Sequence, residues 1–283
     1  MKILISDRLR RITSRHNALV KELRRAFSQG EPTPDGYCAI ESVRVVEEAI
    51  RSGLRFRAVF FSESAEQRAE RLLPQIGANV ETLLLPDEVF RSAVATETPQ
   101  GVAALVKLKH SDFGALLGPS SPLIMGVAGI QDPGNLGTIV RSAEAFGATA
   151  VLLGEKTVSP FNPKVVRASA GSLFRLNVVS ATLADVLPKM RERGVRLVGT
   201  SSHKGRPLTQ VDLTGPLALF IGSEGAGLPR GVLSEMDENV VIPHSDRVES
   251  LNAGVAASIL LYEAARQRGT LNLETPEGEP EED

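Results

Sequence analysis

Three short stretches in the second half of the chain hold residues whose types and spacing could bind a ligand. The first is Gly222-Ser223-Glu224-Gly225-Ala226-Gly227, which follows the apolar run Leu217–Ile221. Such a run predicts a buried strand that ends in a glycine turn. Glycine lets backbone groups approach a ligand with no Cβ between them. The stretches Ile242-Pro243 and Ser250-Leu251-Asn252 follow soon after, so we expect a pocket built largely from backbone.

A fourth stretch, Asn135-x-Gly137-x-x-x-Arg141, places an arginine on the second turn of a predicted helix. A helix N-terminus attracts anions, and a guanidinium can hold a phosphate through two hydrogen bonds. Taken alone, the same residues also describe an ordinary helix that Asn135 caps and that carries a surface arginine. Ser250 could likewise be only a helix cap.

Several common catalytic sites are missing from the sequence. There is no G-x-x-x-x-G-K-[ST] phosphate loop, and no G-x-G-x-x-G joins the first strand and helix of either half. Neither H-E-x-x-H nor G-x-S-x-G is present. The single cysteine, Cys38, excludes an internal disulfide and a cysteine-based metal cluster. We therefore expect no metal cofactor.

In combination, the four stretches resemble the motifs of the SpoU (TrmH-like) RNA ribose methyltransferases. Ile130–Gly147 resembles the first motif of that family, and Leu219–Leu228 resembles the second. Val241–Pro243 together with Ser250–Asn252 resembles the third. The segment Pro163–Ser172 is similar to a further stretch common in the family. The resemblance covers about residues 120–268, and ordered motifs seldom agree by chance. Roughly the first 108 residues resemble the small substrate-binding domain often fused to it.

The resemblance implies a fold, a cofactor and partners. The fold class is α/β, with a C-terminal parallel sheet whose last segment threads a loop to form a trefoil knot, and a small N-terminal α/β RNA-binding domain. The implied cofactor is S-adenosylmethionine, held bent in the knot. The expected cofactor-binding residues are Thr200, Leu219, Gly222, Ile242 and Leu251. The implied assembly is a homodimer in which the partner subunit completes each active site.

The implied reaction is methyl transfer to a ribose 2′-hydroxyl. The sulfonium methyl is already activated, so the protein must align the groups and help with the hydroxyl proton. Arg141 would approach the hydroxyl or the adjacent phosphate and, because its guanidinium stays protonated, stabilise the developing alkoxide or assist proton removal by phosphate. Asn135 would orient Arg141 or the ribose, and Glu224 would hold the loop or bind RNA. Ser250 and Asn252 would position the methionine end of the cofactor and Arg141.

The sequence departs from the family pattern in two places beside the expected pocket. His244 follows Ile242-Pro243 where methionine is common, and Asp246–Glu249 adds charge before Ser250. We interpret His244 as a loop residue rather than a proton carrier, because the expected mechanism already has its groups.

The pattern of apolar runs predicts the elements that must position these residues. Strands are predicted in the second half at Leu123–Ala128, Ala150–Leu153, Leu176–Val179, Arg196–Thr200, Leu217–Ile221 and Val240–Ile242. Helices are predicted up to Phe146, over Asn162–Phe174 and Leu183–Arg193, and from Asn252 to near Arg268. The first half alternates helices and strands, beginning with a helix that Ser14 caps and that runs to about Phe27.

Charge is distributed unevenly along the chain. The 283 residues carry a formal net charge of −2, but removing the six acidic residues after Leu271 changes it to +4. The first 30 residues hold eight Lys or Arg residues against Asp7 and Glu22. Such an arm often meets phosphate, although it could also be a solvated helix face. The candidate RNA-binding residues are Arg11, Arg15, Lys21, Arg24 and Arg25.

We expect three parts: an RNA-binding domain over 1–110, a methyltransferase domain over 111–270, and a disordered acidic tail over 271–283. A hydrophobic content of 42% and the lack of a long apolar run predict a cytoplasmic protein without a membrane span. Ribosomal RNA is the expected substrate. Three alternatives stay open: a tRNA 2′-O-methyltransferase, a non-catalytic RNA-binding or ribosome-assembly protein on the same scaffold, and an enzyme that methylates a base nitrogen.

Overall fold

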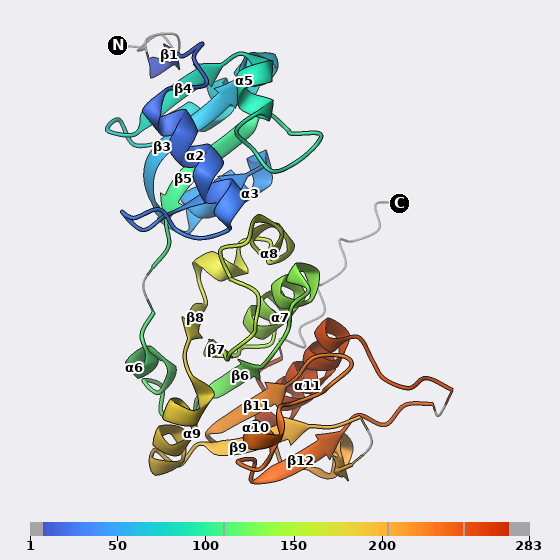
Figure 1. The fold of residues 1–283 in the computed structure, drawn as a ribbon. Coiled ribbons are helices and arrows are strands. Elements are labelled where there is room, and N and C mark those ends of the chain that lie inside the picture. The colour runs from blue at the N-terminus through green and yellow to red at the C-terminus, as the bar shows by residue number, and fades with distance from the viewer. Residues whose placement is uncertain (1–7, 110, 203, 246, 272–283) are drawn as a thin grey trace, which may run out of the picture.

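The computed structural model describes residues 8–109, 111–202, 204–245 and 247–271. The chain forms two sheets, one from its N-terminal part and one from its C-terminal part, and each packs against helices (Figure 1). The predicted acidic tail lies outside the described residues from position 272 onward.

The N-terminal sheet is mixed and has the strand order β1-β4-β3-β5-β2. Its strands are β1 (Arg10–Arg11), β2 (Tyr37–Glu41), β3 (Arg55–Ser62), β4 (Glu81–Leu85) and β5 (Val102–Lys107). Strand β3 pairs in parallel with β4 and antiparallel with β5. The helices of this part are α2 (Ala18–Gln29), α3 (Val43–Arg51), α4 (Glu66–Leu72) and α5 (Asp87–Arg91), with 3-10 turns at η1 (Glu63–Ala65) and η2 (Leu73–Gln75).

Strand β3 shows why a continuous apolar run forms a buried strand here. Successive side chains of a strand point to opposite faces of the sheet. Val59 and Phe61 pack in the core that contains residues of α3 and α4, whereas Phe60 packs in a separate core with Val20 and Leu23 of α2. Because both faces are covered, the strand needs no polar alternation.

The C-terminal sheet has seven strands in the order β10-β12-β9-β11-β6-β7-β8, and all of its pairings are parallel. The strands are β6 (Leu123–Val127), β7 (Ala150–Leu153), β8 (Asn177–Ser180), β9 (Arg196–Thr200), β10 (Arg206–Pro207), β11 (Leu217–Ile221) and β12 (Glu238–Val241). The predicted α/β class with a parallel C-terminal sheet is therefore confirmed. The trefoil knot concerns the path of the last segment through a loop and stays a prediction.

The helices of the C-terminal part differ in length. They are α6 (Phe113–Leu116), α7 (Pro133–Ala145), α8 (Pro163–Ala168), α9 (Leu183–Glu192), α10 (Arg230–Leu233) and α11 (Ala253–Arg268), with 3-10 turns at η3 (Ser172–Phe174) and η4 (Leu208–Gln210). Helix α9 agrees with the predicted helix over Leu183–Arg193 and contains Pro188 in its interior. The last helix begins after its cap Asn252 and ends at Gly269, whose φ of 64° is left-handed.

The predicted helix over Asn162–Phe174 is wrong in its middle. Helix α8 ends at Ala168, and a separate 3-10 turn follows at Ser172–Phe174. Ala170 and Gly171 between them have φ values of 50° and 94°, which no right-handed helix contains. The glycine lets the chain change direction at this point, and the change matters for how the two sheets meet.

The start of the first long helix is also different from the prediction. Asn17, not Ser14, caps α2 by accepting a hydrogen bond from the Leu19 backbone N–H. The Ser14 hydroxyl instead accepts from the backbone N–H of His16 in a turn before the helix. Both Ser14 and Asn17 are of residue types that cap helices, and the sequence alone does not decide which of them caps α2.

Candidate active site

The carboxyl ends of β9, β11 and β12 lie at one edge of the C-terminal sheet, because these strands are parallel neighbours. A pocket of about 550 Å³ opens there. It is lined by the glycine turn Gly222–Gly227 after β11, by Thr200 at the end of β9, by Ile242 after β12, and by Leu251 before α11. The three predicted loops therefore meet around one cavity.

Four of the five predicted cofactor-binding residues line this pocket. They are Thr200, Gly222, Ile242 and Leu251. Leu219 does not line it and is fully buried in the core. The strand ends at Ile221, and two residues of strand place Leu219 roughly 6–7 Å below the edge where the ligand loops begin.

Gly222 is the tightest point of the glycine turn. The turn closes when the Gly227 N–H donates to the Ser223 carbonyl oxygen over 2.8 Å. A Cβ on Gly222 would lie 2.0 Å from the Gly227 carbonyl carbon and 2.2 Å from the Leu228 nitrogen. Real Cβ atoms do not approach backbone so closely, so a glycine is required at this position.

The Glu224 carboxylate joins the glycine turn to the beginnings of two helices. Its Oε1 accepts hydrogen bonds from Asn135 Nδ2 (2.9 Å) on α7, and from Asn252 Nδ2 (2.7 Å) and the Ala253 backbone N–H (3.2 Å) at the start of α11. Asn252 Nδ2 also lies 2.9 Å from Asn135 Oδ1. A carboxylate near helix N-termini is favoured by the helix dipoles. Glu224, Asn135 and Asn252 thus form one polar cluster beside the pocket, which we call the Glu224 cluster.

Asn135 is available for this cluster because it does not cap its own helix. The cap of α7 is Asp132, whose Oδ1 accepts from the Asn135 backbone N–H over 2.8 Å. The side chain of Asn135 is therefore free to reach Glu224. Asp132 was not predicted to be this cap, although an Asp three residues before Asn135 and directly before Pro133 is a regular helix-start signal.

Arg141 lies two turns along α7 and is exposed. Within the described ranges its guanidinium has no hydrogen bond or ion pair, and it does not line the pocket. Ser250 does line the pocket, next to Glu249 and His244. His244 Nδ1 lies 2.7 Å from the Ile242 carbonyl oxygen, which holds the ring against its own loop. One chain thus gathers Asn135, Glu224 and Asn252, but it does not bring Arg141 to the pocket.

Some pocket residues were not singled out from the sequence. Leu228, Leu233 and Ala256 add apolar surface to the wall. Ala256 is four residues after Asn252 and therefore lies on the same helix face, a relation that the predicted helix already contained. Leu233 belongs to the short helix α10, which was not predicted from the pattern of apolar residues.

The candidate RNA-binding residues lie on the N-terminal part of the chain, away from the pocket (Figure 1). Arg15, Lys21 and Arg25 are exposed. Arg24 is partly engaged, since its guanidinium donates to the backbone oxygen and hydroxyl of Ser92 at 2.8 and 2.9 Å. Arg11 pairs with the Glu63 carboxylate. The structure does not bring these five residues together with the Glu224 cluster.

Comparison with known proteins identifies two matching families along the chain. The SpoU rRNA Methylase family matches residues 122–262, and the MRM3-like substrate binding domain matches residues 17–104. A relative from Bacillus subtilis, the 23S rRNA (guanosine(2553)-2'-O)-methyltransferase RlmP, is 31% identical over 90% of this chain and 98% of its own.

Two of the solved structures that resemble this chain contain the cofactor S-adenosylmethionine (AdoMet). The SpoU methyltransferase AviRb from Streptomyces viridochromogenes, in complex with AdoMet, is 28% identical with a TM-score of 0.79 and covers 89% of this chain and 98% of its own. The AdoMet-bound rRNA methyltransferase from Sinorhizobium meliloti is 27% identical with a TM-score of 0.79 and covers 92% and 98%, respectively.

Proposed function

The chain belongs to the SpoU rRNA methylase family, and we propose that it transfers a methyl group from S-adenosylmethionine to a ribose 2′-hydroxyl of ribosomal RNA. The observation that carries the proposal is the Glu224 cluster, which ties the glycine turn of the pocket to Asn135 and Asn252. The Bacillus subtilis relative and the Sinorhizobium meliloti structure each match about nine tenths of the chain and are named for rRNA, which supports ribosomal RNA as the substrate.

The pocket fits S-adenosylmethionine by its chemistry. Its volume lies within the range of ~300–1,000 Å³ usual for small-molecule sites. Backbone groups of the glycine turn can meet the polar edge of an adenine, and Ile242, Leu228 and Leu251 offer apolar surface to its face. When bound, the cofactor supplies an activated methyl group. We propose Thr200, Gly222, Ile242 and Leu251 as the residues that hold it.

The remaining chemistry is to position a hydroxyl and to stabilise it as it loses its proton. We propose that Arg141 does this by placing a permanent positive charge beside the developing alkoxide or the adjacent phosphate, since a guanidinium does not give up its proton near neutral pH. Asn135, held by Glu224, would orient the ribose, and Ser250 would position the methionine end of the cofactor.

The Glu224 cluster gives a first test of these roles. Replacing Glu224 with glutamine removes the charge that accepts three hydrogen bonds, so Asn135 and Asn252 lose their shared anchor. We expect kcat/KM to fall by roughly 10- to 100-fold, since hydrogen bonds to a charged group contribute ~1.5–3 kcal/mol. The Glu249→Gln variant is the matched control. It also removes one negative charge from the pocket wall, but it leaves the hydrogen bonds of Asn135 and Asn252 intact. Equal losses in both variants would mean that charge alone, and not positioning, matters.

We propose that the active protein is a homodimer whose second copy supplies Arg141 to each pocket. Two features support a second copy beside α7 and α11. Val255 and Tyr262 on α11 are 48% and 47% exposed, and the Tyr262 ring packs edge-on against Phe146 at the end of α7. Arg141 on α7 is exposed and, in the part of the chain that the structure describes, has no polar partner of its own.

Mixing two inactive variants tests this arrangement. An Arg141→Ala chain keeps its pocket, and a Gly222→Ala chain keeps its arginine. A mixed dimer then contains one intact site, so re-association at equal amounts should restore about a quarter of the wild-type activity. If each site were complete within one chain, the mixture would stay inactive.

The N-terminal part is proposed to hold the RNA, with Arg11, Arg15, Lys21, Arg24 and Arg25 as phosphate contacts. The proposed boundaries are 1–110 for this domain and 111–270 for the methyltransferase domain. Within the described ranges, no helix combines the length and apolar composition needed to cross a membrane. An enzyme that modifies ribosomal RNA would act in the cytoplasm, which we propose as its location.

The substrate class is tested with labelled S-adenosylmethionine and two RNA samples, unmodified ribosomal RNA and unmodified transfer RNA. Label in ribosomal RNA is the expected result. Label only in transfer RNA would keep the chemistry and overturn the proposed substrate. Failure to bind the cofactor in a calorimetric titration would instead favour a non-catalytic RNA-binding protein.

A further inference from the structure

Among the residues that the structure describes, one segment of the C-terminal domain, residues 159–175, makes that domain's side-chain hydrogen bonds with the N-terminal part; we call it the docking segment. It begins where the Ser159 hydroxyl donates to the Gly30 carbonyl oxygen at the end of α2 (3.0 Å). It continues through α8, which packs against the edge strand β2, and ends at Arg175 after η3. In Figure 1, α8 lies between the two sheets.

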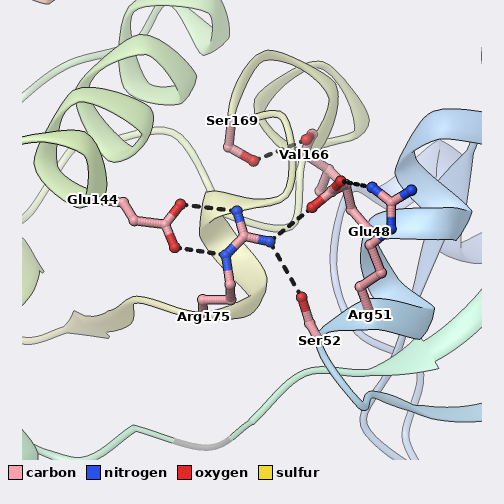
Figure 2. Close-up of polar contacts among 7 residues, drawn as sticks. All are labelled: Glu48, Arg51, Ser52, Glu144, Val166, Ser169 and Arg175. Carbon is pink, nitrogen blue, oxygen red and sulfur yellow. Dashed lines mark hydrogen bonds and ion pairs between the residues drawn. The ribbon is translucent and has the colours of Figure 1, made fainter. Parts of the chain in front are cut away.

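Arg175 holds carboxylates from both domains at once (Figure 2). Its Nε and Nη2 donate to the two oxygens of Glu144 on α7, at 2.6 and 2.9 Å. Its Nη1 donates to Glu48 on α3 at 2.8 Å and to the Ser52 hydroxyl at 3.4 Å. A two-point bond to a carboxylate fixes the plane of the guanidinium. The hydrogen bonds from Arg175 lower the pKa of the Glu144 carboxyl group. The hydrogen bonds to Glu144 and to Glu48 raise the pKa of the Arg175 guanidinium.

The backbone of the docking segment is shaped to admit Glu48. Gly171 has a φ of 94°, and a Cβ there would lie 2.8 Å from the Glu48 Cβ and 2.9 Å from its Cγ. Any side chain at this position would therefore push α3 away from the C-terminal domain. The break in the predicted helix at Ala170 and Gly171 thus lets the two domains approach closely enough for Arg175 to reach Glu48.

A second polar contact lies farther back in the docking segment. Arg167 Nη1 lies 3.2 Å from the Thr96 hydroxyl, which in turn donates to Glu41 Oε2 over 2.8 Å. Glu41 ends β2 and is only 3% exposed, and burial raises the pKa of its carboxyl group. Arg167 therefore supports a buried acidic group of the other domain, in the same interface as Arg175.

We propose that Arg175 is a positioning residue that fixes the RNA-binding domain against the helix carrying Arg141. Glu144 follows Arg141 by three residues on α7, so the two lie one turn apart on neighbouring positions of the helix. The chain Glu48–Arg175–Glu144 then sets the orientation in which RNA held by the first domain reaches the second. This proposal rests on the function proposed above, and it assigns a role to the Pro163–Ser172 stretch that neither the cofactor pocket nor the Glu224 cluster uses.

The connection between the domains is also fixed at its C-terminal side. Leu116 of α6 is fully buried in the C-terminal core, and the Ser111 hydroxyl donates to Asn177 Oδ1 over 3.2 Å. The stretch that joins the two domains is therefore anchored from Ser111 onward, and His110 before it lies outside the described residues. With the linker anchored, the domain orientation depends on the docking segment.

The test compares Arg175→Gln, Glu48→Gln and the double variant with Arg191→Gln. Arg191 is the matched control: its side chain is 38% exposed against 39% for Arg175, and it pairs with Glu235 and Asp237 within the C-terminal domain. Four quantities are measured: KM and kcat for unmodified ribosomal RNA, the dissociation constant of S-adenosylmethionine, and the pair-distance distribution from small-angle X-ray scattering.

We expect either single variant to raise the RNA KM by a factor of about 3 to 10, with kcat and cofactor affinity within about twofold of wild type. The double variant should be no worse than Arg175→Gln alone, because both single variants already break the same Arg175–Glu48 contact. The pair-distance distribution should be broader than that of the wild type for all three of these variants. It should be unchanged for Arg191→Gln.

An unchanged RNA KM and scattering curve in both single variants would overturn the proposal. So would an equal effect of Arg191→Gln, which would indicate general destabilisation. If the wild-type protein methylated no RNA, the proposed function would be wrong, while the scattering comparison would still decide whether Arg175 fixes the domains.

Discussion

Replacing Arg141 with alanine is expected to abolish methyl transfer while leaving the affinity for S-adenosylmethionine nearly unchanged. The side chain lies outside the pocket of its own chain, so its loss leaves the cofactor site intact. In the proposed mechanism it supplies the one permanent positive charge beside the reacting hydroxyl. Losing such a group lowers kcat by roughly 10²- to 10³-fold or more.

The measurement combines single-turnover methyl transfer with calorimetric cofactor titration. Arg141→Lys should recover only part of the rate, because an ammonium keeps the charge but not the two-point geometry of a guanidinium. Arg193→Ala removes another exposed arginine of the same domain and should behave like wild type. Near-normal turnover in Arg141→Ala would remove Arg141 from the mechanism.

Replacing Gly222 with alanine is expected to destroy the cofactor site. The new methyl group would lie only 2.0 to 2.2 Å from backbone atoms of Gly227 and Leu228, far closer than non-bonded atoms can approach. The turn must open to relieve this contact, and the pocket wall moves with it. We expect the affinity for S-adenosylmethionine to fall by roughly 100-fold.

Gly225→Ala provides the control within the same turn. A Cβ on Gly225 meets no atom within 4 Å, and its backbone does not require a positive φ. The variant should leave the turn closed and therefore lose far less cofactor affinity than Gly222→Ala. Equal tolerance of both substitutions would show that the turn is pliable and that close backbone approach at Gly222 does not shape the pocket.

The loops of the site were predictable from the sequence because their signals are local. An apolar run that ends in glycines, as at Leu217–Ile221, fixes a buried strand and the loop after it. Parallel neighbours then bring the loops after β9, β11 and β12 to the same edge. The family resemblance supplied the ligand and the reaction, which strand patterns do not contain.

The contacts between those loops were not predictable. Glu224 accepts hydrogen bonds from both Asn135 and Asn252, although these residues are far apart in the chain. They meet only because of the order of the strands in the sheet. That Asp132 would cap α7, leaving the Asn135 side chain free, depends on a choice between two nearby caps.

The interface between the domains was the feature least predictable from the sequence. The stretch Asn162–Phe174 has helical periodicity, and the docking of α3 on Gly171 interrupts it through a tertiary contact. Arg175 has no local pattern that marks its two partners, one of which lies in the other domain. Tertiary packing overrode the local helix signal here.

The chemical position of the transferred methyl group distinguishes ribose methylation from base methylation. Unmodified ribosomal RNA is incubated with the protein and methyl-labelled S-adenosylmethionine, then digested with alkali, which cannot cleave a linkage next to a methylated 2′-oxygen. We expect label in one alkali-resistant dinucleotide, and we expect this label to disappear with Arg141→Ala. Label released entirely as methylated mononucleotides would place the methyl group on a base and contradict the proposed ribose chemistry.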